Sequence, residues 1–369
     1  MRIGIMLRHI GEAGGIVTYT HNLLRAFLRQ GPEHTYCLFY ASPRHRGRFQ
    51  GPNVEEYVLP GRNKLLWDQW QVPRLARRIG VEVIFNPKLS IPLFSPVPPV
   101  LVLRPEQFVH PELFRWWDRI YFKTFIPLYC RAARFIIAPT HAASRDIVRY
   151  VGADPNKMVT VHEAAGDHFF APPPPPQEVE RIRRKYSLPE RYVLFVGGLT
   201  PLKNFERLVR AFALVRQEED IELVVVGFRR WKFEQDLAFA RNHPVSKHIH
   251  FPGFVEDQDL PTVYRLATCL FFPSIYEGFG IPVCEVFATG CPVVTSNRGC
   301  SPEVAGDAAI LVNPFEVEDM AAGLHRVVSQ PALRAELAAK GRRRAPYFRF
   351  SRTARQTLEV LSRAARGDL

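Results

Sequence analysis

The chain has 369 residues, of which 47 % are hydrophobic and 23 % are charged, and this composition excludes a mainly disordered protein. A chain of this length can form two domains of ordinary size. Its longest apolar runs are of strand length, well below the roughly 18–20 residues that a membrane helix needs. The first residues enter a strand pattern directly, without a secretory signal, so we expect a cytoplasmic protein.

The six cysteines show neither a CxxC pair nor a spacing typical of Cys/His metal ligands. In a reducing compartment such residues are usually small buried hydrophobic side chains. We therefore expect no metal site and no disulfide bonds.

The net charge is +13, and most of the excess lies in the first half of the chain. Residues 1–165 hold 22 Lys and Arg against 12 Asp and Glu, whereas residues 166–369 hold 27 against 24. An anionic partner should therefore meet the first half. Nucleic acid, an anionic membrane surface and a phosphorylated substrate all fit this charge, and a basic surface that only keeps the protein in solution is the alternative.

Short apolar runs alternate with helical patterns along the chain, as is typical of parallel sheets covered by helices on both faces. Helical stripes follow Gly15 and Asn204, the second being a plausible N-cap, and the stretch Phe350–Ala365 is a third. The runs expected to form strands are Arg2–Leu7, Thr35–Tyr40, Val81–Phe85, Val100–Leu103, Arg134–Ala138, Tyr192–Gly197, Glu222–Gly227, Cys269–Pro273 and Pro292–Ser296.

Five prolines in Ala171–Pro176 divide this pattern, because a proline run favours an extended conformation and acts as a semi-rigid spacer. Two tandem units of this kind predict an α/β fold with two doubly wound, Rossmann-like domains that face each other across a cleft. We place the first domain at residues 1–170, the linker at 171–177 and the second domain at 178–347, with a C-terminal helix at about 348–369.

Ligands of doubly wound sheets lie beyond the carboxyl ends of the strands, so the strand-to-helix loops are the candidate site. In the first loop, Gly14 and Gly15 allow the backbone to approach an anion at a helix N-terminus, although a simple tight turn explains them equally well. This loop matches neither GxGxxG nor a P-loop. In the second loop, Gly197 and Gly198 end a strand and Lys203 can meet a phosphate, with a solvated lysine as the alternative.

The third loop, Phe271–Glu285, is the most specific, since it places two glutamates eight residues apart around a glycine-rich turn. Glu277 can accept hydrogen bonds from sugar hydroxyls and Glu285 from a ribose diol, and two unrelated surface charges are the alternative. A fourth loop, Ser296–Val304, would close the same cleft. The backbone amides expected to cradle a diphosphate are those of Phe279, Gly280 and Ile281.

Four motifs together resemble glycosyltransferase family 4: Lys203-Asn204, Gly253-Phe254-Val255, the Pro273-to-Glu285 block, and the Ser301-to-Asp307 block. The similarity covers essentially the whole chain and is strongest over residues 190–320, where the spacing of the two glutamates around an EGFG core is specific. The resemblance implies the GT-B architecture and a retaining, metal-independent hexosyltransferase. It also implies that the C-terminal helix packs back on the first domain and that the first domain takes the acceptor.

The same resemblance gives the motif residues their roles. Lys203 would neutralise the donor diphosphate, Glu277 would hold the transferred sugar near its C3 and C4 hydroxyls, and Glu285 would bind the ribose. Lys203 and Glu277 would be catalytic residues, and Arg104 is a third candidate, although it does not match the family motif. The remaining donor-binding residues would be Gly14 and Gly15 of the first domain, Gly197, Gly198 and Gly227 at strand ends, Gly253, Phe254 and Val255 around the base, and Gly278, Phe279, Gly280 and Ile281.

Two positions depart from the family pattern. Family members often have an arginine where this chain has Gly198 or Leu199, so one phosphate cation would be missing, and Arg298 or Arg104 could substitute for it. Many members also have His-Asp where this chain has Arg104 and the two residues after it, which leaves the contact to the sugar C6 hydroxyl unassigned. His110 lies nearby in the sequence, but a lone histidine is more often a surface or packing residue.

We expect a hexosyltransferase that moves mannose or a related sugar from a GDP- or UDP-linked donor to a glycan or lipid-linked glycan in bacterial polysaccharide or lipopolysaccharide biosynthesis. The nucleotide sugar is a co-substrate, and no further cofactor is expected. Front-face substitution explains retention without a placed nucleophile, and a Glu277 nucleophile is the alternative mechanism. A GT-B-like phosphorylase or epimerase is the alternative function. A nucleic-acid-binding protein is disfavoured because no such motif occurs.

The segment between the second and third predicted strands of the first domain is basic and carries interleaved apolar residues. Such a segment can bind an anionic bilayer, so the protein is expected in the cytoplasm or peripherally on the cytoplasmic membrane face. The alternative is that the aromatic residues belong to the core. The apolar residues are Phe49, Leu65, Leu66, Trp67 and Trp70, and the cations are Arg44, Arg46, Arg48, Arg62, Lys64, Arg74, Arg77 and Arg78.

Overall fold

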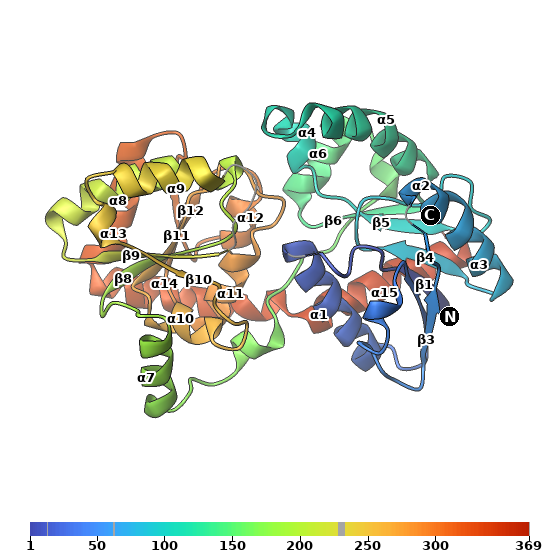
Figure 1. Ribbon diagram of the computed structural model, residues 1–369, viewed down its shortest axis with the longest axis horizontal. Coiled ribbons are helices and arrows are strands. Elements are labelled where there is room, and N and C mark those ends of the chain that lie inside the picture. The colour runs from blue at the N-terminus through green and yellow to red at the C-terminus, as the bar shows by residue number, and fades with distance from the viewer. Residues whose placement is uncertain (13, 62, 228–232, 369) are drawn as a thin grey trace. The chain divides into compact units, whose positions relative to one another are not determined.

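Two α/β units make up the chain in the computed structural model, which describes residues 1–12, 14–61, 63–227 and 233–368 (Figure 1). The first unit consists of Met1–Glu163 together with Phe350–Leu369, and the second unit consists of Ala164–Arg349. The last helix of the chain therefore belongs to the unit that contains the first strand.

The division between the units lies a few residues before the expected boundary at residue 170. Ala165 and Phe169 are buried in the core of the second unit, so the chain has already entered that unit there. Arg265 of the second unit donates hydrogen bonds to the Phe169 and Ala171 carbonyls. The start of the proline run is thereby attached to the second unit, and a helix begins at its last proline, Pro176.

Each unit is built around one sheet in which every strand pair is parallel, which confirms the predicted class of two doubly wound α/β domains. The first sheet comprises β1 (Arg2–Met6), β2 (Thr35–Tyr40), β3 (Val54–Val58), β4 (Val83–Asn86), β5 (Pro99–Val102), β6 (Phe135–Ala138) and β7 (Met158–Thr160). The second comprises β8 (Tyr192–Val196), β9 (Glu222–Val226), β10 (Ile249–Gly253), β11 (Cys269–Phe272), β12 (Val293–Ser296) and β13 (Ile310–Val312).

The strand order places one switch point in each sheet. The orders are β3-β2-β1-β4-β5-β6-β7 and β10-β9-β8-β11-β12-β13. In the first sheet β2 and β3 lie on one side of β1, and β4 to β7 lie on the other side, so the switch point is between β1 and β4. In the second sheet the switch point is between β8 and β11 for the same reason. At such a point the loops that follow neighbouring strands diverge, which leaves room for a ligand at the carboxyl edge.

Every predicted strand is present, and four further strands, β3, β7, β10 and β13, are absent from the prediction. All four are edge strands. Strand β3 has the sequence Val-Glu-Glu-Tyr-Val and is half-buried along its whole length. An edge strand can keep charged residues, because it lacks a second neighbour and is covered less completely than a central one.

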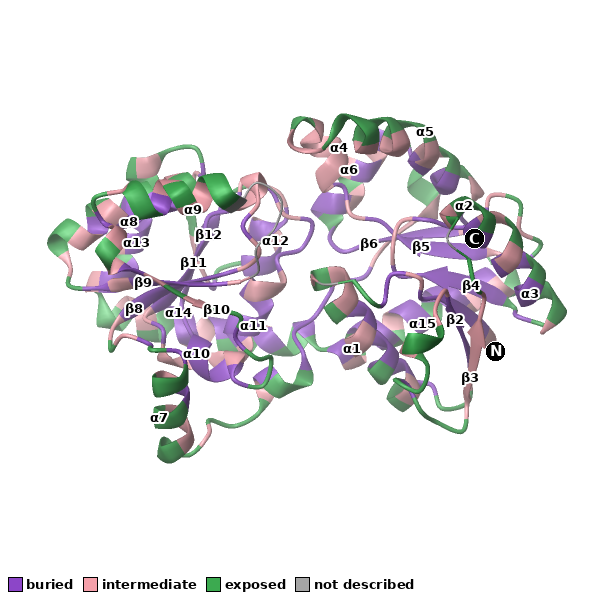
Figure 2. Ribbon diagram, viewed as in Figure 1, coloured by how far each residue is buried: buried purple, intermediate pink, exposed green. Residues whose placement is uncertain are grey.

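Helices cover both faces of each sheet, so the central strands are buried while the helices expose their outer sides (Figure 2). Helices of the first unit are α1 (Gly15–Gln30), α2 (Lys64–Leu66), the π-helical turn η2 (Trp67–Gln71), α3 (Val72–Arg78), α4 (Glu106–Val109), α5 (Trp116–Ala132), α6 (His141–Val151) and α15 (Phe350–Arg366). Those of the second are α7 (Pro176–Lys185), α8 (Phe205–Glu218), α9 (Phe233–Asn242), α10 (Leu260–Leu266), α11 (Ile281–Thr289), α12 (Ser301–Ala305), α13 (Val317–Ser329) and α14 (Pro331–Arg344). Short 3-10 turns lie at Pro43–His45, Pro111–Leu113, Pro155–Lys157, Asp167–Phe170, Pro201–Lys203, Ser246–His248 and Ala345–Phe348.

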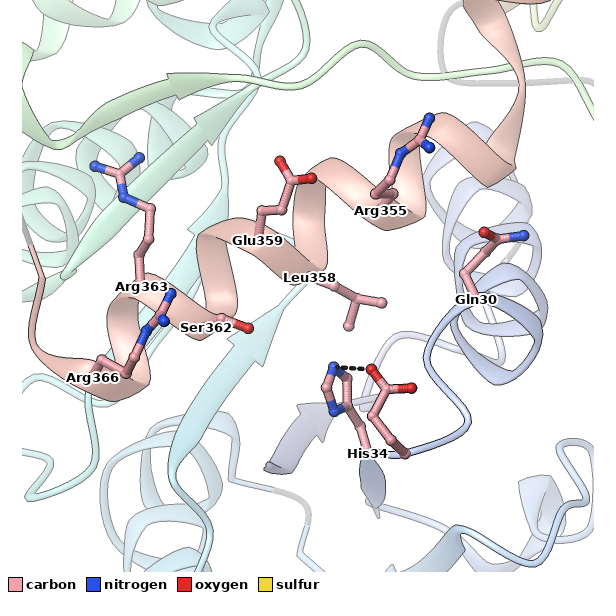
Figure 3. Close-up of a pocket in the computed structure, with 9 residues that line it drawn as sticks. Gln30, His34, Arg355, Leu358, Glu359, Ser362, Arg363 and Arg366 are labelled. Carbon is pink, nitrogen blue, oxygen red and sulfur yellow. Dashed lines mark ion pairs between the residues drawn. The ribbon is translucent and has the colours of Figure 1, made fainter.

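Helix α15 packs against α1 in the first unit. The Phe350 ring lies 6.0 Å from the Tyr19 ring, and Leu361 is completely buried. Beside α15 lies a cavity of about 570 Å³, which is also bordered by Gln30 and His34 (Figure 3). Because His34 directly precedes β2, this cavity lies at the amino edge of the sheet, away from the loops that can bind a ligand.

All six cysteines are buried as free thiols. Among the described residues, each helix is too short or too polar to cross a lipid bilayer. The sequence had assigned Phe49 and Trp67 to a membrane-binding segment, and the structure contradicts this, because both are buried. Trp67 instead donates its indole N–H to the Leu59 carbonyl at 2.9 Å.

Replacing Leu361 by alanine should lower the free energy of unfolding of the first unit by about 2–5 kcal/mol, because the change leaves a cavity under α15. Urea denaturation followed by circular dichroism measures the loss. Leu214→Ala is the matched control, since Leu214 is exposed on α8 and its loss should cost far less. Equal costs for the two changes would show that α15 does not complete the core of the first unit.

Candidate functional site

The carboxyl ends of β8 and β9 approach each other so closely that a side chain would not fit between them. The Gly197 amide donates to the Val226 carbonyl at 2.9 Å, and a Cβ built on Gly227 would lie 1.9 Å from the Gly197 carbonyl oxygen. Any residue other than glycine at position 227 would push the two strand ends apart. Gly197, followed by the half-buried Gly198, is thereby fixed beside the side chain of Lys203.

Lys203 and Glu277 form the centre of the candidate site. Lys203 ends the short turn that follows β8, Glu277 lies in the loop after β11, and Lys203 Nζ lies 2.6 Å from Glu277 Oε1. The ammonium group also lies 4.4 Å from the centre of the Phe272 ring. Only 18 % and 14 % of the two side chains is exposed, so their attraction is screened less than that of a surface pair.

The side chain of Asn204 joins the loops that carry this pair. Asn204 is the N-cap residue of α8, as predicted, but its backbone has a φ of 59° and its side chain makes no capping hydrogen bond. Instead Nδ2 donates to the Pro273 carbonyl at 3.1 Å and to the Pro314 carbonyl at 2.6 Å. One buried amide therefore connects the loops that follow β8, β11 and β13.

The loop after β11 turns into α11 at Gly280, whose φ of 83° suits glycine. The first amides of an α-helix lack partners within the helix, so this end of α11 attracts an anion. The Phe279 side chain lies in the core, with its ring 5.8 Å from that of Phe348. The buried Gly278 and the half-buried Ile281 lie on either side of this turn, at the carboxyl edge.

The loop after β12 packs against the backbone of Glu277. Gly299 has a φ of 58°, and a Cβ built on it would lie 3.1 Å from the Glu277 carbonyl oxygen. The Cys300 amide donates to the same carbonyl at 3.4 Å. Arg298 is exposed on this loop.

Glu285 lies in the second turn of α11, and its carboxyl group is buried. The Tyr264 hydroxyl on α10 donates to Glu285 Oε2 at 2.8 Å. Burial raises the pKa of Glu285 to about 7, because the charged form loses its hydration, and the Tyr264 hydrogen bond offsets only part of this effect. The two glutamates thus differ: Glu277 faces a cation, and Glu285 faces a neutral hydroxyl.

The residues expected to surround the base lie at the end of β10. Gly253 has a φ of 81°, and the pairing of β10 with β9 shifts register just before it. The two residues after it point in different ways, since Phe254 is half exposed and Val255 is buried in the core. The Phe254 ring is therefore accessible to a ligand, whereas Val255 anchors the loop in the core of the second unit.

In the first unit, Gly14 and Gly15 lie where β1 leads into α1. Gly14 is the residue before the helix, with a φ of 121°, and Gly15 is its first residue. Next to this turn, His9 is buried and its Nε2 lies 3.0 Å from the Thr20 hydroxyl. Burial lowers the pKa of His9 to about 3, with Lys88 and Arg104 adding to the effect, so His9 is neutral at pH 7.

Arg104 is already paired within the first unit. Its Nε donates to Glu163 Oε1 at 2.8 Å, and its guanidinium lies 5.0 Å from the centre of the Tyr19 ring. The buried carboxylate neutralises the cation, so a phosphate at Arg104 would have to compete with Glu163. His110 lies 3.0 Å from the exposed Glu112. The predicted roles of Arg104 and of Gly14 and Gly15 stay predictions.

A cavity of about 220 Å³ lies at the switch point of the first unit, beyond β1 and β4, and is absent from the sequence prediction. Its charged residues occur mostly in pairs: Lys64 Nζ lies 2.6 Å from Asp68 Oδ2, and Lys88 Nζ lies 2.6 Å from Glu12 Oε2. Arg8 lines the same cavity. The four-residue spacing of Lys64 and Asp68 was the only local signal of such pairing.

Within the ranges that the structure describes, His, Cys, Asp and Glu form no group of three or more that could hold a metal ion.

Two parallel sheets with glycine-rich carboxyl edges, and a lysine–glutamate pair in the second, define a two-unit, doubly wound α/β protein. The chain matches two glycosyltransferase families, with residues 13–164 matching "Glycosyltransferase Family 4" and residues 178–344 matching "Glycosyl transferases group 1". Together the two matches span most of the chain. The chain therefore belongs to glycosyltransferase family 4.

Similar curated proteins include mannosyltransferases. The chain is 29 % identical over 232 residues to the O-antigen chain mannosyltransferase B of Escherichia coli, covering 62 % of this chain and 60 % of the relative. It is 27 % identical over 232 residues to the serotype-specific mannosyltransferase WbdA of Escherichia coli, covering 62 % of this chain but only 28 % of WbdA. The chain thus spans between about a quarter and 60 % of the length of these relatives.

Solved structures show the same architecture at low identity. Sucrose-phosphate synthase from Thermosynechococcus elongatus has a TM-score of 0.81 at 18 % identity and covers 100 % of both chains. The lipopolysaccharide glycosyltransferase WaaG has a TM-score of 0.73 at 16 % identity, covering 98 % of this chain and 99 % of WaaG. Anabaena HepE in complex with UDP-glucose has a TM-score of 0.74 at 16 % identity, with 98 % and 99 % covered. The fold is GT-B.

The raised pKa of Glu285 predicts a pH dependence of folding. Because the folded state holds this proton more tightly than the unfolded state, the stabilisation is complete below pH 4.5 and is lost as the pH rises through about 7. Between pH 5 and pH 8 the wild type should lose up to roughly 3 kcal/mol from this group, and Glu285→Gln should not show that part of the loss.

Urea unfolding at the two pH values measures the difference. Glu318→Gln is the control, since Glu318 is exposed on α13 and should leave the wild-type pH dependence unchanged. If Glu285→Gln and the wild type lose the same free energy between pH 5 and pH 8, Glu285 has an ordinary pKa in the folded protein.

Proposed function

We propose that this chain is a retaining, metal-independent hexosyltransferase. It transfers a hexose, mannose or a related sugar, from a GDP- or UDP-linked donor to a glycan or a lipid-linked glycan. The mannosyltransferase names of its relatives support the sugar, and the UDP-glucose complex of the structurally similar HepE supports a nucleotide-sugar donor. The O-antigen mannosyltransferase among the relatives supports a role in building a bacterial polysaccharide.

The Lys203–Glu277 pair at the carboxyl edge of the second sheet is the observation that carries this proposal. A nucleotide sugar has an anionic diphosphate next to a neutral sugar with several hydroxyls. An ammonium group binds the first and a carboxylate accepts hydrogen bonds from the second. Because Lys203 Nζ and Glu277 Oε1 are 2.6 Å apart, one ligand can contact both at the bond that breaks.

The proposed reaction needs no group that forms a covalent intermediate. The acceptor oxygen forms a bond to the anomeric carbon on the face from which the diphosphate leaves, and the acceptor proton passes to the departing phosphate oxygen. Negative charge therefore grows on the diphosphate. Lys203 and the amides at the start of α11 stabilise this charge, while Glu277 holds the sugar in position.

The remaining parts of the donor would lie along the same edge. Gly197 and Gly227 keep the ends of β8 and β9 free of side chains, so the diphosphate can approach the backbone. Glu285 would accept hydrogen bonds from the ribose diol in its ionised form, and the segment Gly253–Val255 would border the base. Since ionised Glu285 is favoured only above about pH 7, donor binding should strengthen as the pH rises through that value.

The acceptor would bind in the first unit. The cavity beyond β1 and β4 has paired charges, Lys64 with Asp68 and Lys88 with Glu12, and such pairs offer donors and acceptors to sugar hydroxyls. The excess of cations in residues 1–165 suits an acceptor that carries phosphate or lies on an anionic membrane. The protein would then work in the cytoplasm, in part at the membrane surface.

A single assay tests the reaction class. The protein is incubated with GDP-, UDP- and ADP-linked hexoses, with and without EDTA, and release of the nucleoside diphosphate is followed. We expect release from one donor class at a rate that EDTA does not change, and NMR of the transferred sugar should show the donor's anomeric configuration. Activity lost with EDTA contradicts metal independence, and an inverted product contradicts front-face substitution.

Replacing Lys203 by alanine should lower kcat by at least about 100-fold, because the growing charge on the diphosphate loses its cation. The KM for the donor should change much less. Steady-state kinetics with the donor identified above measures both constants. Lys203→Arg should recover part of the rate, and Lys247→Ala, which removes an exposed lysine of the same unit, should behave like the wild type. Wild-type kcat in Lys203→Ala would contradict the proposed phosphate contact.

A further inference from the structure

The chain segment from the end of β10 through α10 connects two parts of the proposed nucleotide site. Its first residues, Gly253–Val255, would border the base, and Tyr264 on α10 donates at 2.8 Å to Glu285, which would bind the ribose. Burial is the main cause of the raised pKa of Glu285, and the negative charge of Asp257 on this segment adds to it. The position of this segment therefore affects the contacts proposed for both the base and the ribose.

A buried carboxylate lies in the middle of this segment. Asp259 is the N-cap residue of α10, but its side chain makes no capping hydrogen bond, and only 3 % of it is exposed. The carboxylate instead faces α7, which lies next to α10 and begins at the last residue of the proline run (Figure 1). Arg181 of α7 donates to Oδ1 at 2.9 Å. Lys185 Nζ and the Tyr186 hydroxyl each donate to Oδ2 at 2.8 Å, so all these donors come from α7 or the residue after it.

Two of these donors also hold Glu256, which lies between the base segment and α10. Lys185 Nζ donates to Glu256 Oε1 at 2.8 Å, and the Glu256 amide donates to the Tyr186 hydroxyl oxygen at 3.2 Å. The Glu256 carbonyl accepts from the Asp259 amide at 2.9 Å, which closes the turn before α10. The segment is therefore attached to α7 through its backbone as well as through two carboxylates.

Asp259 keeps its charge at neutral pH. Burial by itself raises the pKa of this carboxyl group, but the hydrogen bonds from Lys185, Tyr186 and Arg181 together outweigh burial and hold the pKa below its usual value. Hydrogen bonds between charged groups are shorter and stronger than neutral ones, and they are stronger still away from water. The network around Asp259 therefore restricts the position of the segment more closely than exposed contacts would.

The second unit does not depend on this network to keep α10 on the sheet. The Tyr192 hydroxyl of β8 donates to the Val263 carbonyl of α10 at 2.7 Å. A buried ion pair adds little net stability, because the loss of hydration offsets the attraction. Arg181 and Lys185 are 45 % and 33 % exposed, so the loss of the Asp259 charge leaves neither cation buried without water. The network should therefore affect the position of the segment more than the folding of the unit.

We propose that Asp259 is a positioning residue for the nucleoside of the donor. With its partners on α7 it holds the segment after β10 where Gly253–Val255 borders the base and Tyr264 reaches Glu285. Asp259 acts through these residues and not by contact with the donor. The inference rests on the proposed function, since it takes a nucleotide as the ligand of this edge, and it extends the site to a helix that precedes the second sheet in the chain.

Calorimetric titration of the full chain with GDP, UDP and ADP tests this inference, and it first identifies the nucleotide that the wild type binds. Asp259→Asn should weaken binding of that nucleotide and raise the donor KM, each roughly tenfold, because a segment that occupies the binding position a tenth of the time lowers the apparent affinity by that factor. The kcat should stay within about twofold of the wild type. Asp220→Asn is the control, since exposed Asp220 pairs with Arg216 at 2.8 Å in the same unit, and it should leave both constants unchanged.

Lys185→Met provides a second variant, because it removes one donor and leaves Asp259 with Arg181 and Tyr186. It should raise the donor KM by a smaller factor, and Lys185→Arg, which keeps the cation, should recover most of the wild-type value. Inhibition by inorganic diphosphate separates the two ends of the nucleotide. It should be the same in every variant, because the diphosphate is proposed to bind at Lys203 and the start of α11, outside the network.

Circular dichroism and urea unfolding show which variants are folded, and if Asp259→Asn is not, the two Lys185 variants decide. A wild type that binds no nucleoside diphosphate would contradict the proposed function together with the inference. A wild type that binds one, with Asp259→Asn and Lys185→Met binding it equally well, would overturn the inference alone. A loss of kcat and of diphosphate inhibition in folded Asp259→Asn would also overturn it, because the change would then disturb the whole site and not the nucleoside part.

Discussion

The side-chain amide of Asn204 is the contact on which the charged centre of the second unit depends. It follows directly after Lys203 and donates to carbonyls behind β11 and β13, so three loops that have no covalent link near the site are held at fixed distances. The Ile275 amide, which donates to the Leu202 carbonyl at 2.8 Å, also holds the loop of Glu277 to the turn after β8. The backbone of Asn204 is left-handed, and its side chain joins these loops to α8, because Oδ1 accepts a hydrogen bond from Arg207 at 3.1 Å.

The central part of each sheet could be predicted because burial on both faces demands continuous apolar runs, such as Tyr192–Val196. The edge strands could not, since partial cover removes that demand, as in β3 with its two glutamates. The prediction also placed the domain boundary at the proline run, the most visible break in the sequence. The boundary lies earlier in the structure, because Phe169 packs into the core of the second unit. A contact of this kind cannot be predicted from a local sequence pattern.

Some features of the candidate site could likewise be predicted from the sequence, and others could not. Glycines and charged residues after strands could be predicted, because the carboxyl edge of a parallel sheet is where loops converge. Partners from distant elements could not. The pairing of Arg104 with Glu163, the hydroxyl of Tyr264 on Glu285 and the loop-joining role of Asn204 each join residues at least 21 positions apart. Such contacts follow from the tertiary fold; the Tyr264 hydrogen bond partly offsets the effect of burial on the pKa of Glu285, and Glu163 limits the availability of Arg104.

The position of α15 has a consequence for how the chain matures on the ribosome. Its last helix completes the hydrophobic core around Tyr19, yet it is synthesised after all of Ala164–Arg349. The second unit can therefore fold as soon as it emerges, whereas the first must wait with the inner side of α1 uncovered. A nascent chain that stalls late in translation would carry one finished unit and one that still exposes apolar surface, which is the kind of surface that chaperones bind.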